Sequence, residues 1–545
     1  MTDLLREGAG PRFTAVNEPV LGYRPGSPER RDLEAELNRQ ACTARDLPLV
    51  IGGQRVQGCR LAPVKAPHDH RMVLGHVGLA EKSQVSKAIE AATKAQTEWS
   101  RWSLAERSAV FLKAADLLAG PWRQRVNAAT MLGQSKTAQQ AEIDAACELI
   151  DFLRFNVQFA QEIAAQQPIS SAGVRNRTDY RPLEGFIYAV TPFNFTAIGG
   201  NLVAAPALMG NTVLWKPAGT AVLSNFLVME LLEEAGLPQG VINFVPGDPV
   251  SVSEVVMAHP NFAGLHFTGS TAVFDQLWLQ TAQNLQRYRN YPRLVGETGG
   301  KDFVVAHASA DIEALSVALL RGAFEYQGQK CSAASRAYIP ASVWPRLRER
   351  LCDLISTVRM GDVRDLSNFM GAVIDARAYE RITKAIDSVR FASDSRILCG
   401  GTYEDVNGFF IKPTVIEVEN PRHPLMCDEL FGPVLTVHVY EDSRWHEALT
   451  WIDTSTAYAL TGAVFAKDRS ALAEAEARLR FAAGNFYIND KPTGAVVGQQ
   501  PFGGARRSGT NDKAGSALNL LRWVSPRTVK ETHLPARSYA YPSMD

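Results

Sequence analysis

Cys331 stands in the segment EYQGQKCSAASRAYIP, where the residues around the thiol are polar or small and an apolar strand follows. These neighbours make a poor core and are typical of a loop that carries a thiol to a site. The adjacent Lys330 and backbone N–H groups are expected to lower the thiol pKa and favour the nucleophilic thiolate. We therefore predict a nucleophile at Cys331, with an inert buried thiol as the alternative. The other six cysteines are interpreted as inert core residues.

Two further residues have side chains suited to acyl chemistry. Glu297, in LVGETGGKDF, follows an apolar strand and is flanked by glycines, so its carboxylate is a candidate general base, with a solvated turn residue as the alternative. Asn194, in TPFNFTAIGGNL, lies in an uncharged stretch where a buried amide needs partners. It is a candidate donor to a developing oxyanion, with a turn-stabilising role as the alternative.

A nucleotide site is suggested by LWKPAGT and LHFTGS, in each of which an apolar strand runs into a polar turn. The fingerprint G-x-G-x-x-G is absent from this region. The turn at Gly269 and Ser270 nevertheless predicts a helix N-terminus, which is able to receive a pyrophosphate.

The elements around these residues predict an α/β protein. Residues 80–165 have a helical pattern, and from 185 to about 300 short apolar strands alternate with helices, as they do again from 300 to 490. The uncharged run 185–215 is broken by prolines, asparagines and glycines, so it predicts a buried strand–helix–strand unit and no membrane span. Residues 1–45 predict an arm with a short charged helix, and the C-terminus predicts a strand arm.

Composition and charge exclude several classes of protein. The 545 residues are 46% hydrophobic, and 57 basic residues balance 57 acidic ones, which gives no footprint for nucleic acid or an anionic membrane. No Cys-x-x-Cys or His-Glu-x-x-His occurs, so we expect no metal site and no disulfide framework. The first residues, MTDLLREGAG, lack the pattern of a secretory or transit peptide. We expect reduced thiols and a cytoplasmic protein, or a mitochondrial matrix protein if the source is eukaryotic.

In order along the chain, the segments PFNF, WKP, FTGS, GETGGK, GQKCSA, ELFGPV and PFGG resemble the aldehyde dehydrogenase superfamily. The resemblance implies a Rossmann-like cofactor domain, an α/β catalytic domain and a small β oligomerisation arm. We assign 1–45 to an N-terminal arm, 46–165 and 186–297 to the NAD-binding domain, 298–505 to the catalytic domain, and 166–185 with 515–545 to the oligomerisation arm. The resemblance further implies that the cofactor is NAD and that the protein forms a homodimer or a higher homo-oligomer.

EYQGQKCSA, PFNFTAIGGNL, TGAVVGQQPFGGARRSGTNDKAG and the terminal RWVSPRTVKETH resemble the pyrroline-5-carboxylate dehydrogenase branch of that family. The branch oxidises glutamate γ-semialdehyde to glutamate, the second step of proline breakdown, and suggests a separate proline dehydrogenase as a partner. The resemblance makes Cys331 the nucleophile, Glu297 the base, and Asn194 with the Cys331 N–H the oxyanion site. The matching cofactor positions are Thr191, Lys216, Gly269, Ser270, Thr271, Ala272, Val273, Glu429 and Phe431. The matching substrate positions are Glu148, Phe195, Ser332, Gly494, Ala495 and Phe502.

Two residues depart from the pattern of the related proteins. Gly219 stands where many NAD-preferring relatives have an acid, and Ala495 where some relatives have serine. For Glu148 the alternative is a solvated helix face, on which Asp144 would form a mildly unfavourable like-charge pair. The rival functions are an NAD(P)-dependent dehydrogenase for another semialdehyde and a catalytically silent binding protein on the same scaffold.

Overall fold

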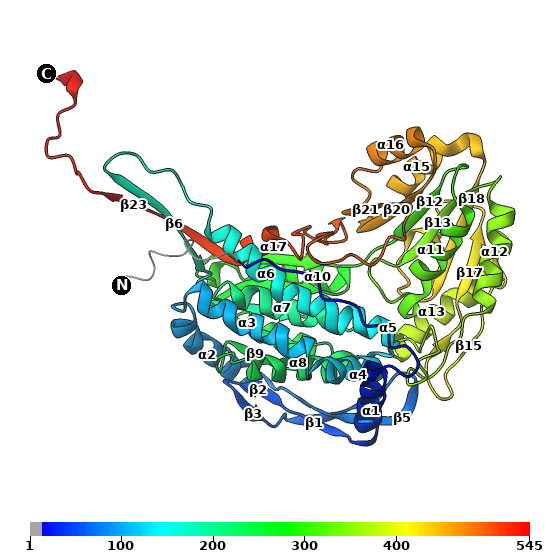
Figure 1. The fold of residues 1–545 in the computed structure, drawn as a ribbon, viewed down its shortest axis with the longest axis horizontal. Coiled ribbons are helices and arrows are strands. Elements are labelled where there is room, and N and C mark those ends of the chain that lie inside the picture. Colours follow the sequence, from blue (N-terminus) through cyan, green and yellow to red (C-terminus); the bar gives the residue numbers. More distant parts are fainter. Residues whose placement is uncertain (1–12, 545) are drawn as a thin grey trace.

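The computed structural model describes residues 13–544, so the expectation for the N-terminal ten residues lies outside the described part of the chain. Two lobes lie side by side, and an arm projects from the first of them (Figure 1). The first lobe is built on a sheet whose strands, in spatial order, are β11 (Arg293–Glu297), β10 (Phe262–Thr268), β7 (Phe186–Val190), β8 (Thr212–Lys216), β9 (Ile242–Phe244), β2 (Leu49–Ile51) and β3 (Gln54–Val56). The first five strands are parallel, and β2 and β3 add an antiparallel edge.

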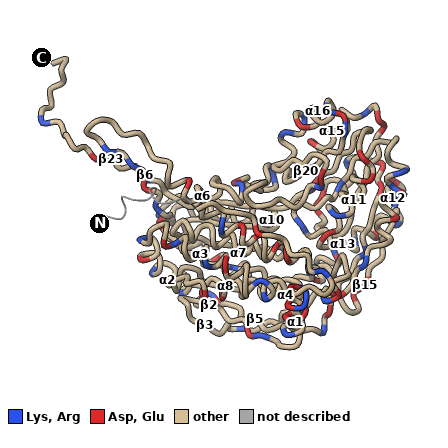
Figure 2. Tube along the Cα trace, viewed as in Figure 1, with Lys and Arg blue, Asp and Glu red and all other residues tan. Residues whose placement is uncertain are grey.

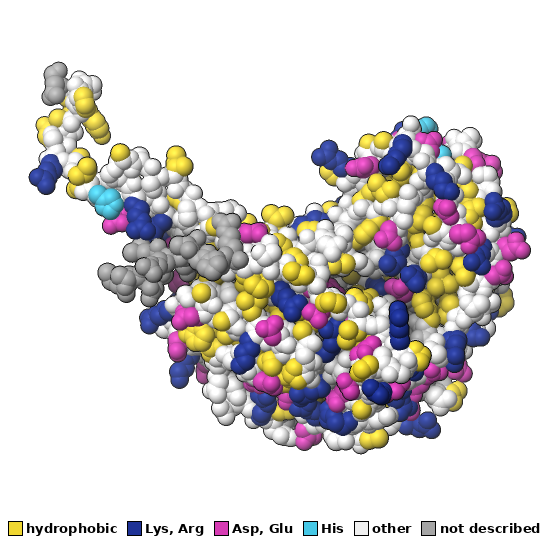
Figure 3. Space-filling view, in the orientation of Figure 1, with side chains coloured by type: hydrophobic (Ala, Val, Ile, Leu, Met, Phe, Trp, Pro, Cys, Tyr) yellow, Lys and Arg dark blue, Asp and Glu magenta, His cyan; other side chains and the backbone are white. Residues whose placement is uncertain are grey.

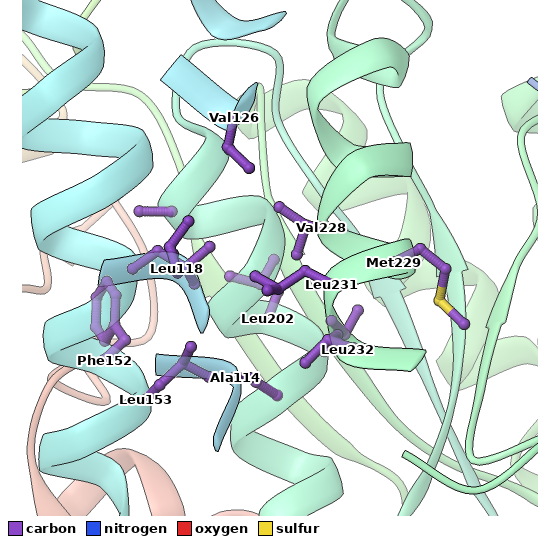
Figure 4. Close-up of a cluster of buried hydrophobic side chains, with 14 of the residues drawn as sticks. Ala114, Leu118, Val126, Phe152, Leu153, Leu202, Val228, Met229, Leu231 and Leu232 are labelled. Atoms are coloured by element: carbon purple, nitrogen blue, oxygen red, sulfur yellow. The ribbon is translucent and has the colours of Figure 1, made fainter. Parts of the chain in front are cut away.

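Both faces of this sheet are covered, which explains why its strands read as continuous apolar runs. Phe186 and Tyr188 belong to a core cluster shared with helices α2 (Lys82–Trp99) and α9 (Pro249–Met257). Ile187 and Ala189, which alternate with them, pack on the other face. Figure 4 shows part of that second cluster, with side chains from α3 (Leu104–Ala119), α4 (Arg123–Gln134), α6 (Leu149–Ala164), α7 (Thr196–Leu208) and α8 (Val222–Glu234).

The uncharged run 185–215 is confirmed as the buried unit β7–α7–β8. The charged helix predicted near the N-terminus is α1 (Pro28–Cys42). The helical pattern after residue 138 is continuous but not uniform, because α5 (Ala138–Ala141) and α6 are joined by a π-helical turn, η2 (Glu142–Glu148). The sequence analysis assigned no strands between residues 45 and 79, where the chain forms β2, β3 and a small sheet of β1 (Arg45–Leu47), β5 (Asp69–Leu79) and β4 (Arg60–Ala66).

The second lobe repeats the architecture. Its sheet order is β14 (Ser395–Cys399), β17 (Thr414–Val418), β18 (Val434–Tyr440), β13 (Ala334–Pro340), β12 (Asp302–Ala306), β20 (Thr461–Phe465) and β21 (Asn485–Ile488). Only β14 runs antiparallel to its neighbour. Phe303 and Val305 pack in one cluster with α13 (Ala376–Val389), α15 (Trp445–Thr454) and α16 (Arg469–Arg478). Val304 and Ala306 pack on the opposite face with α11 (Ile312–Phe324) and α12 (Trp344–Ser356).

The projecting arm pairs two segments that are far apart in the sequence. Strand β6 (Val174–Pro182) is antiparallel to β23 (Val524–Thr532) over nine residue pairs, and the short helix α17 (Ala517–Leu521) precedes β23. The C-terminal end of the chain lies beyond β23, at the far end of the arm (Figure 1). Ile169 and Leu534, in the segments that flank the two strands, are strongly exposed. The arm therefore presents apolar side chains away from both lobes.

Charged side chains of both signs are distributed along the whole trace (Figure 2). On the face shown in Figure 3, basic and acidic groups are intermixed over both lobes. Among residues 13–544, no helix combines the length and apolar character that crossing a membrane requires.

Candidate functional site

The site lies at the connection between the two sheets, where the chain leaves the first sheet and enters the second. Glu297 is the last residue of β11, and β12 begins five residues later. Cys331 lies after the 3-10 turn η5 (Glu325–Gly328) and just before β13. The carboxyl edge of one sheet and the amino edge of the other therefore contribute to a single site, which explains the short glycine-rich link between Glu297 and β12.

The Cys331 thiol is half-buried, and its pKa lies well above that of an ordinary cysteine. Removal from bulk water is the main cause, and the nearby acids Asp302, Glu297 and Glu429 add to it. The expectation that Lys330 lowers this pKa is wrong. The ammonium of Lys330 donates to the Glu325 carboxylate at 2.9 Å and forms a partly buried ion pair with it.

Two donors converge near the nucleophile. Asn194 is buried, and its Nδ2 donates to the backbone carbonyl of Gln329 at 3.0 Å. An amide nitrogen carries two hydrogens, so this bond orients the group and leaves a second donor. Within residues 13–544, the Cys331 backbone N–H donates to no other residue. The pair is therefore suited to the oxyanion that forms on a carbonyl oxygen when the Cys331 sulfur adds to the carbonyl carbon.

The Glu297 carboxylate is held by the PFGG segment. Its Oε2 accepts the backbone N–H of Gly504 at 3.0 Å. A Cβ on the neighbouring Gly503 would lie 3.0 Å from Oε1, so the glycine lets the loop approach the acid closely. Burial raises the carboxyl pKa well above its usual value, although the Gly504 bond opposes this. A carboxyl group with a raised pKa is a stronger proton acceptor once ionised, which suits a base.

A cavity of about 750 Å³ joins the two catalytic candidates to the predicted substrate residues. Its wall includes both Cys331 and Glu297. The predicted substrate residues that line it are Glu148, Phe195, Ser332, Gly494, Ala495 and Phe502. Asn194 is absent from the wall, but it is bonded to the backbone carbonyl of Gln329, two residues before the nucleophile.

The predicted carboxylate anchor is a loop in which Gly494 has a φ of +96°, a conformation that only glycine adopts without strain. The Ser332 hydroxyl donates to the Thr493 hydroxyl at 2.8 Å, which ties the nucleophile segment to this loop. A Cβ at Gly494 would lie 3.3 Å from Nζ of Lys491. The structure thus adds a cation beside the anchor that the sequence analysis did not identify.

Glu148 ends the π-helical turn and lies on the cavity wall, so a solvated helix face is the wrong interpretation. Removal from bulk water raises its pKa to about 8, and the neighbouring Asp144 adds to the effect. The like-charge pair is also not on a surface, because Asp144 is fully buried. π-Helical turns are frequent at functional sites, where they redirect one or two side chains.

The predicted cofactor residues lie outside this cavity, at the carboxyl ends of adjacent strands of the first sheet. Thr191 follows β7, Lys216 ends β8, and Gly269 follows β10. The strand order reverses between β7 and β10, because the chain adds β8 and β9 on one side of β7 and β10 and β11 on the other. Nucleotides bind at such reversal points in open α/β sheets.

The chemistry of these residues fits a dinucleotide. Burial lowers the pKa of Lys216 to about 8, and within residues 13–544 its ammonium has no hydrogen-bond acceptor or ion-pair partner. Ser270 caps α10 (Thr271–Gln283), as predicted, and the backbone N–H groups of Thr271 and Ala272 donate to no protein acceptor there. An unpaired ammonium can donate to ribose hydroxyls, and free helix amides can donate to a pyrophosphate.

The second lobe reaches this region through Glu429 and Phe431. Glu429 Oε1 accepts the Gly300 N–H at 2.9 Å, and burial raises the carboxyl pKa to about 6. The ring of Phe431 packs edge-on against Phe193, with centroids 5.7 Å apart. Ala272 and Val273 follow in the first turn of α10. All nine predicted cofactor residues are thus placed at or facing the carboxyl edge of the first sheet.

An N-terminal segment that the sequence analysis described only as an arm also reaches the cavity. Asn17, Glu18 and Val20 line its wall. Asn17 Nδ2 donates to Asp151 at 2.8 Å and to the backbone carbonyl of Val497 at 2.9 Å, which joins α6 to the anchor loop. Nothing in the local sequence signals this contact, because it spans 480 residues.

The interpretation of the other cysteines is wrong in two cases, since Cys42 and Cys59 are exposed. Cys147 is buried and lines the cavity, and the remaining three are partly buried. Among residues 13–544, no group of three or more His, Cys, Asp or Glu side chains is placed to hold a metal ion.

The model of the aldehyde dehydrogenase family matches residues 56–529. The chain belongs to the aldehyde dehydrogenase family. The match to the family therefore covers most of the chain and not only the motifs that suggested it. The two-lobed architecture is the aldehyde dehydrogenase fold.

Individual aldehyde dehydrogenases similar to this chain carry a more specific name. The mitochondrial delta-1-pyrroline-5-carboxylate dehydrogenase of Dictyostelium discoideum is 52% identical, over 97% of this chain and 96% of that protein. The Homo sapiens protein of the same name is 49% identical over 98% and 97%. A crystal structure of delta-pyrroline-5-carboxylate dehydrogenase from Mycobacterium tuberculosis, bound with NAD, is 56% identical with a TM-score of 0.95, and covers 98% of this chain and 100% of that one.

Proposed function

We propose that this aldehyde dehydrogenase oxidises L-glutamate γ-semialdehyde, the open form of 1-pyrroline-5-carboxylate, to L-glutamate with NAD. One observation carries the proposal: a single cavity contains Cys331, Glu297 and the loop around Gly494. Phe195 and Phe502 line the same cavity, so it offers a nucleophile, apolar surface for a short stem and a loop for a carboxylate, as a substrate with an aldehyde and a carboxylate requires. Relatives about 50% identical over almost the whole chain carry the corresponding name.

The residues divide the chemistry among them. The Cys331 thiolate attacks the aldehyde carbon, and the oxygen that becomes negative accepts hydrogen bonds from Asn194 Nδ2 and the Cys331 N–H. After oxidation, the acyl group remains on the Cys331 sulfur as a thioester. Glu297 then takes a proton from a water molecule, which attacks the thioester and releases glutamate. The raised pKa of Glu297 supports this role, because its deprotonated carboxylate is a stronger proton acceptor than an ordinary carboxylate.

NAD supplies the one capability that no side chain has, since it accepts the hydride from the aldehyde carbon when bound. We propose that Lys216 and Glu429 hold its riboses and that the N-terminus of α10 holds the pyrophosphate. The Trp215 indole orients the Thr191 side chain for a contact with the cofactor, because its Nε1 donates to the Thr191 hydroxyl at 3.0 Å. Phe431 forms an aromatic wall with Phe193 on the side of the second lobe.

Turnover with pyrroline-5-carboxylate against a panel of simple aldehydes, with NAD and NADP in parallel, tests the function directly. We expect NADH formation with the semialdehyde at a catalytic efficiency far above that of butyraldehyde. Equal efficiency with another semialdehyde that lacks the α-carboxylate would favour the rival substrate. Absence of NADH formation with every aldehyde would favour a silent binding protein.

We expect NAD to be preferred over NADP. Gly219 stands where many NAD-preferring relatives have an acid, and a Cβ there meets nothing within 4 Å, so the position has room for a side chain but supplies no carboxylate. Gly219→Glu should therefore lower efficiency with NADP, because the new carboxylate repels a 2′-phosphate, and leave NAD unchanged or improved. Steady-state kinetics with both cofactors measures this. Comparable efficiency of the parent enzyme with the two cofactors would contradict the preference.

The Gly494 loop should determine the choice of substrate. A side chain at Gly494 forces a strained φ and approaches Lys491, so Gly494→Ala and Gly494→Val should displace the anchor. We expect KM for the semialdehyde to rise by about 10–100-fold, with the valine variant worse, because a buried carboxylate loses its donors. Butyraldehyde, which has no carboxylate, should be spared. Glutamate should inhibit the parent competitively against the semialdehyde and lose potency in both variants; equal loss of both substrates would place the anchor elsewhere.

Assembly and location extend the proposal. We propose that β6 and β23 form an oligomerisation arm in a homodimer or higher homo-oligomer, since the pair projects from its own lobe with exposed apolar flanks. A separate proline dehydrogenase would supply the substrate. We propose a cytoplasmic protein, or a mitochondrial matrix protein if the source is eukaryotic, as the names of the eukaryotic relatives suggest for that case.

A further inference from the structure

Helix α7 begins immediately after Asn194 and Phe195, and it has no capping side chain of its own. Its N-cap residue is Phe195, whose side chain cannot accept a hydrogen bond from the helix amides. The first amides of a helix need acceptors, and a buried helix end cannot obtain them from water. The start of α7 is buried, since Thr196 and Ala197 are fully inaccessible. Some other group must therefore fix the end of the helix that carries the predicted oxyanion donor.

Asp144 provides the cap from the π-helical turn. Its Oδ2 accepts the Thr196 N–H at 3.0 Å, and its Oδ1 accepts the Ala197 N–H at 2.8 Å. Both carboxylate oxygens thus hold consecutive amides, and the negative charge lies at the positive end of the helix dipole. The residue two positions before the first held amide is Asn194.

Lys136 completes the arrangement from the other side. Its Nζ donates to Asp144 Oδ2 at 2.7 Å, and the side chains of the pair are 1% and 0% exposed. The same ammonium lies 4.1 Å from the ring centroid of Phe195 and 4.5 Å from that of Tyr326, five residues before Cys331. One cation therefore touches both chain segments that converge on the site, through contacts that favour an ammonium over an aromatic face.

We propose that Asp144 and Lys136 are positioning residues for the reaction: together they hold the N-terminus of α7 so that Asn194 faces the developing oxyanion and Phe195 faces the substrate. A buried ion pair is seldom a net gain in stability, and removing one member is costly, so a pair in this place has its value in geometry. The inference rests on the proposed role of Asn194.

A double-mutant cycle between Asp144→Asn and Asn194→Ala tests it, with the rate of NADH formation in a single turnover as the readout. Asparagine is nearly isosteric but keeps only one acceptor oxygen and loses the charge. We expect Asp144→Asn alone to lower this rate by about 10–100-fold, the scale of a small misplacement of a reacting group. In the Asn194→Ala background the same change should have little further effect, because the donor it positions is already gone. NAD affinity should be unchanged in all four proteins.

The control is Asp468→Asn. Asp468 caps α16 in the second lobe and also accepts two consecutive amides, from Ser470 at 2.7 Å and Ala471 at 3.3 Å, but α16 does not reach the cavity. We expect no change in the single-turnover rate. If Asp144→Asn proves insoluble, the Lys136→Met/Asp144→Asn protein leaves no lone buried charge and enters the same cycle, with the same coupling expected.

The outcomes separate this inference from the proposed function. If Asn194→Ala leaves the single-turnover rate intact, the oxyanion role itself fails. If Asn194→Ala slows the reaction and Asp144→Asn multiplies that loss in full, Asp144 acts independently of Asn194 and the inference is overturned. An unchanged rate in Asp144→Asn also overturns it.

Discussion

Cys331→Ala should abolish dehydrogenase turnover while the protein still folds and binds NAD. The variant removes the sulfur atom that carries the acyl group in the proposed mechanism, so we expect a loss of at least ~10⁴-fold, the scale seen when a covalent nucleophile is removed. Cys331→Ser should be almost as inactive, because a hydroxyl has a much higher pKa than a thiol. NADH formation from the semialdehyde measures the loss, and thermal unfolding with and without NAD checks folding and binding.

The pKa of the Cys331 thiol adds a pH dependence to this prediction. Burial and three nearby acids raise it, so the thiol of the free enzyme is protonated at neutral pH. The acylation rate should therefore rise with pH as the thiolate fraction grows. Cys42→Ala, which changes an exposed thiol at the end of α1, is the matched control and should leave turnover unchanged. Retention of more than a small fraction of activity in Cys331→Ala would remove Cys331 from the mechanism.

Much of the fold was predictable because its strands are buried on both faces. Such strands read as uninterrupted apolar runs between glycine and proline punctuation, and 186–190 and 212–216 are clear examples. Strands β2 and β3 contain only three residues each: β2 is apolar and buried but too short to stand out, and β3, at the edge of the sheet, is mostly polar and exposed. The division into domains and the role of the arm stay predictions, since pairing of β6 with β23 does not by itself show association between copies.

The candidate site was predictable where neighbours in the sequence are neighbours in space. Glu297 and Ser270 were placed correctly at a strand end and a helix start because local patterns signal both. The partners of the charged side chains could not be predicted in this way, because tertiary packing decides which charged groups meet. Lys330 is adjacent to Cys331 in the chain, yet its ammonium is paired with Glu325. Asp144 caps a helix that begins 52 residues later, and no local motif encodes that contact.

Glu297→Gln should separate the two halves of the reaction. The amide is nearly isosteric and can still accept the Gly504 N–H through its oxygen, but it cannot take a proton from water. We expect a burst of NADH, as the thioester forms on Cys331, followed by steady turnover that is slower by about 10²–10⁴-fold, the usual contribution of a general base. Rapid-mixing measurements of NADH resolve the two phases, and acid quenching should trap the acyl group on Cys331.

The pH dependence of the two rates, burst and hydrolysis, is the control, because each rate depends on the protonation of a different group. Burial raises the pKa of Glu297, and the base is the deprotonated form, so the hydrolysis rate of the parent should rise with pH through that raised pKa and fall as the group is protonated. The burst rate should also rise with pH, but through the Cys331 thiol. Glu297→Gln should therefore flatten the pH dependence that Glu297 imposes on hydrolysis and leave that of the burst. If burst and steady rate are lost equally, Glu297 acts before the thioester, in activating Cys331, and hydrolysis needs another base.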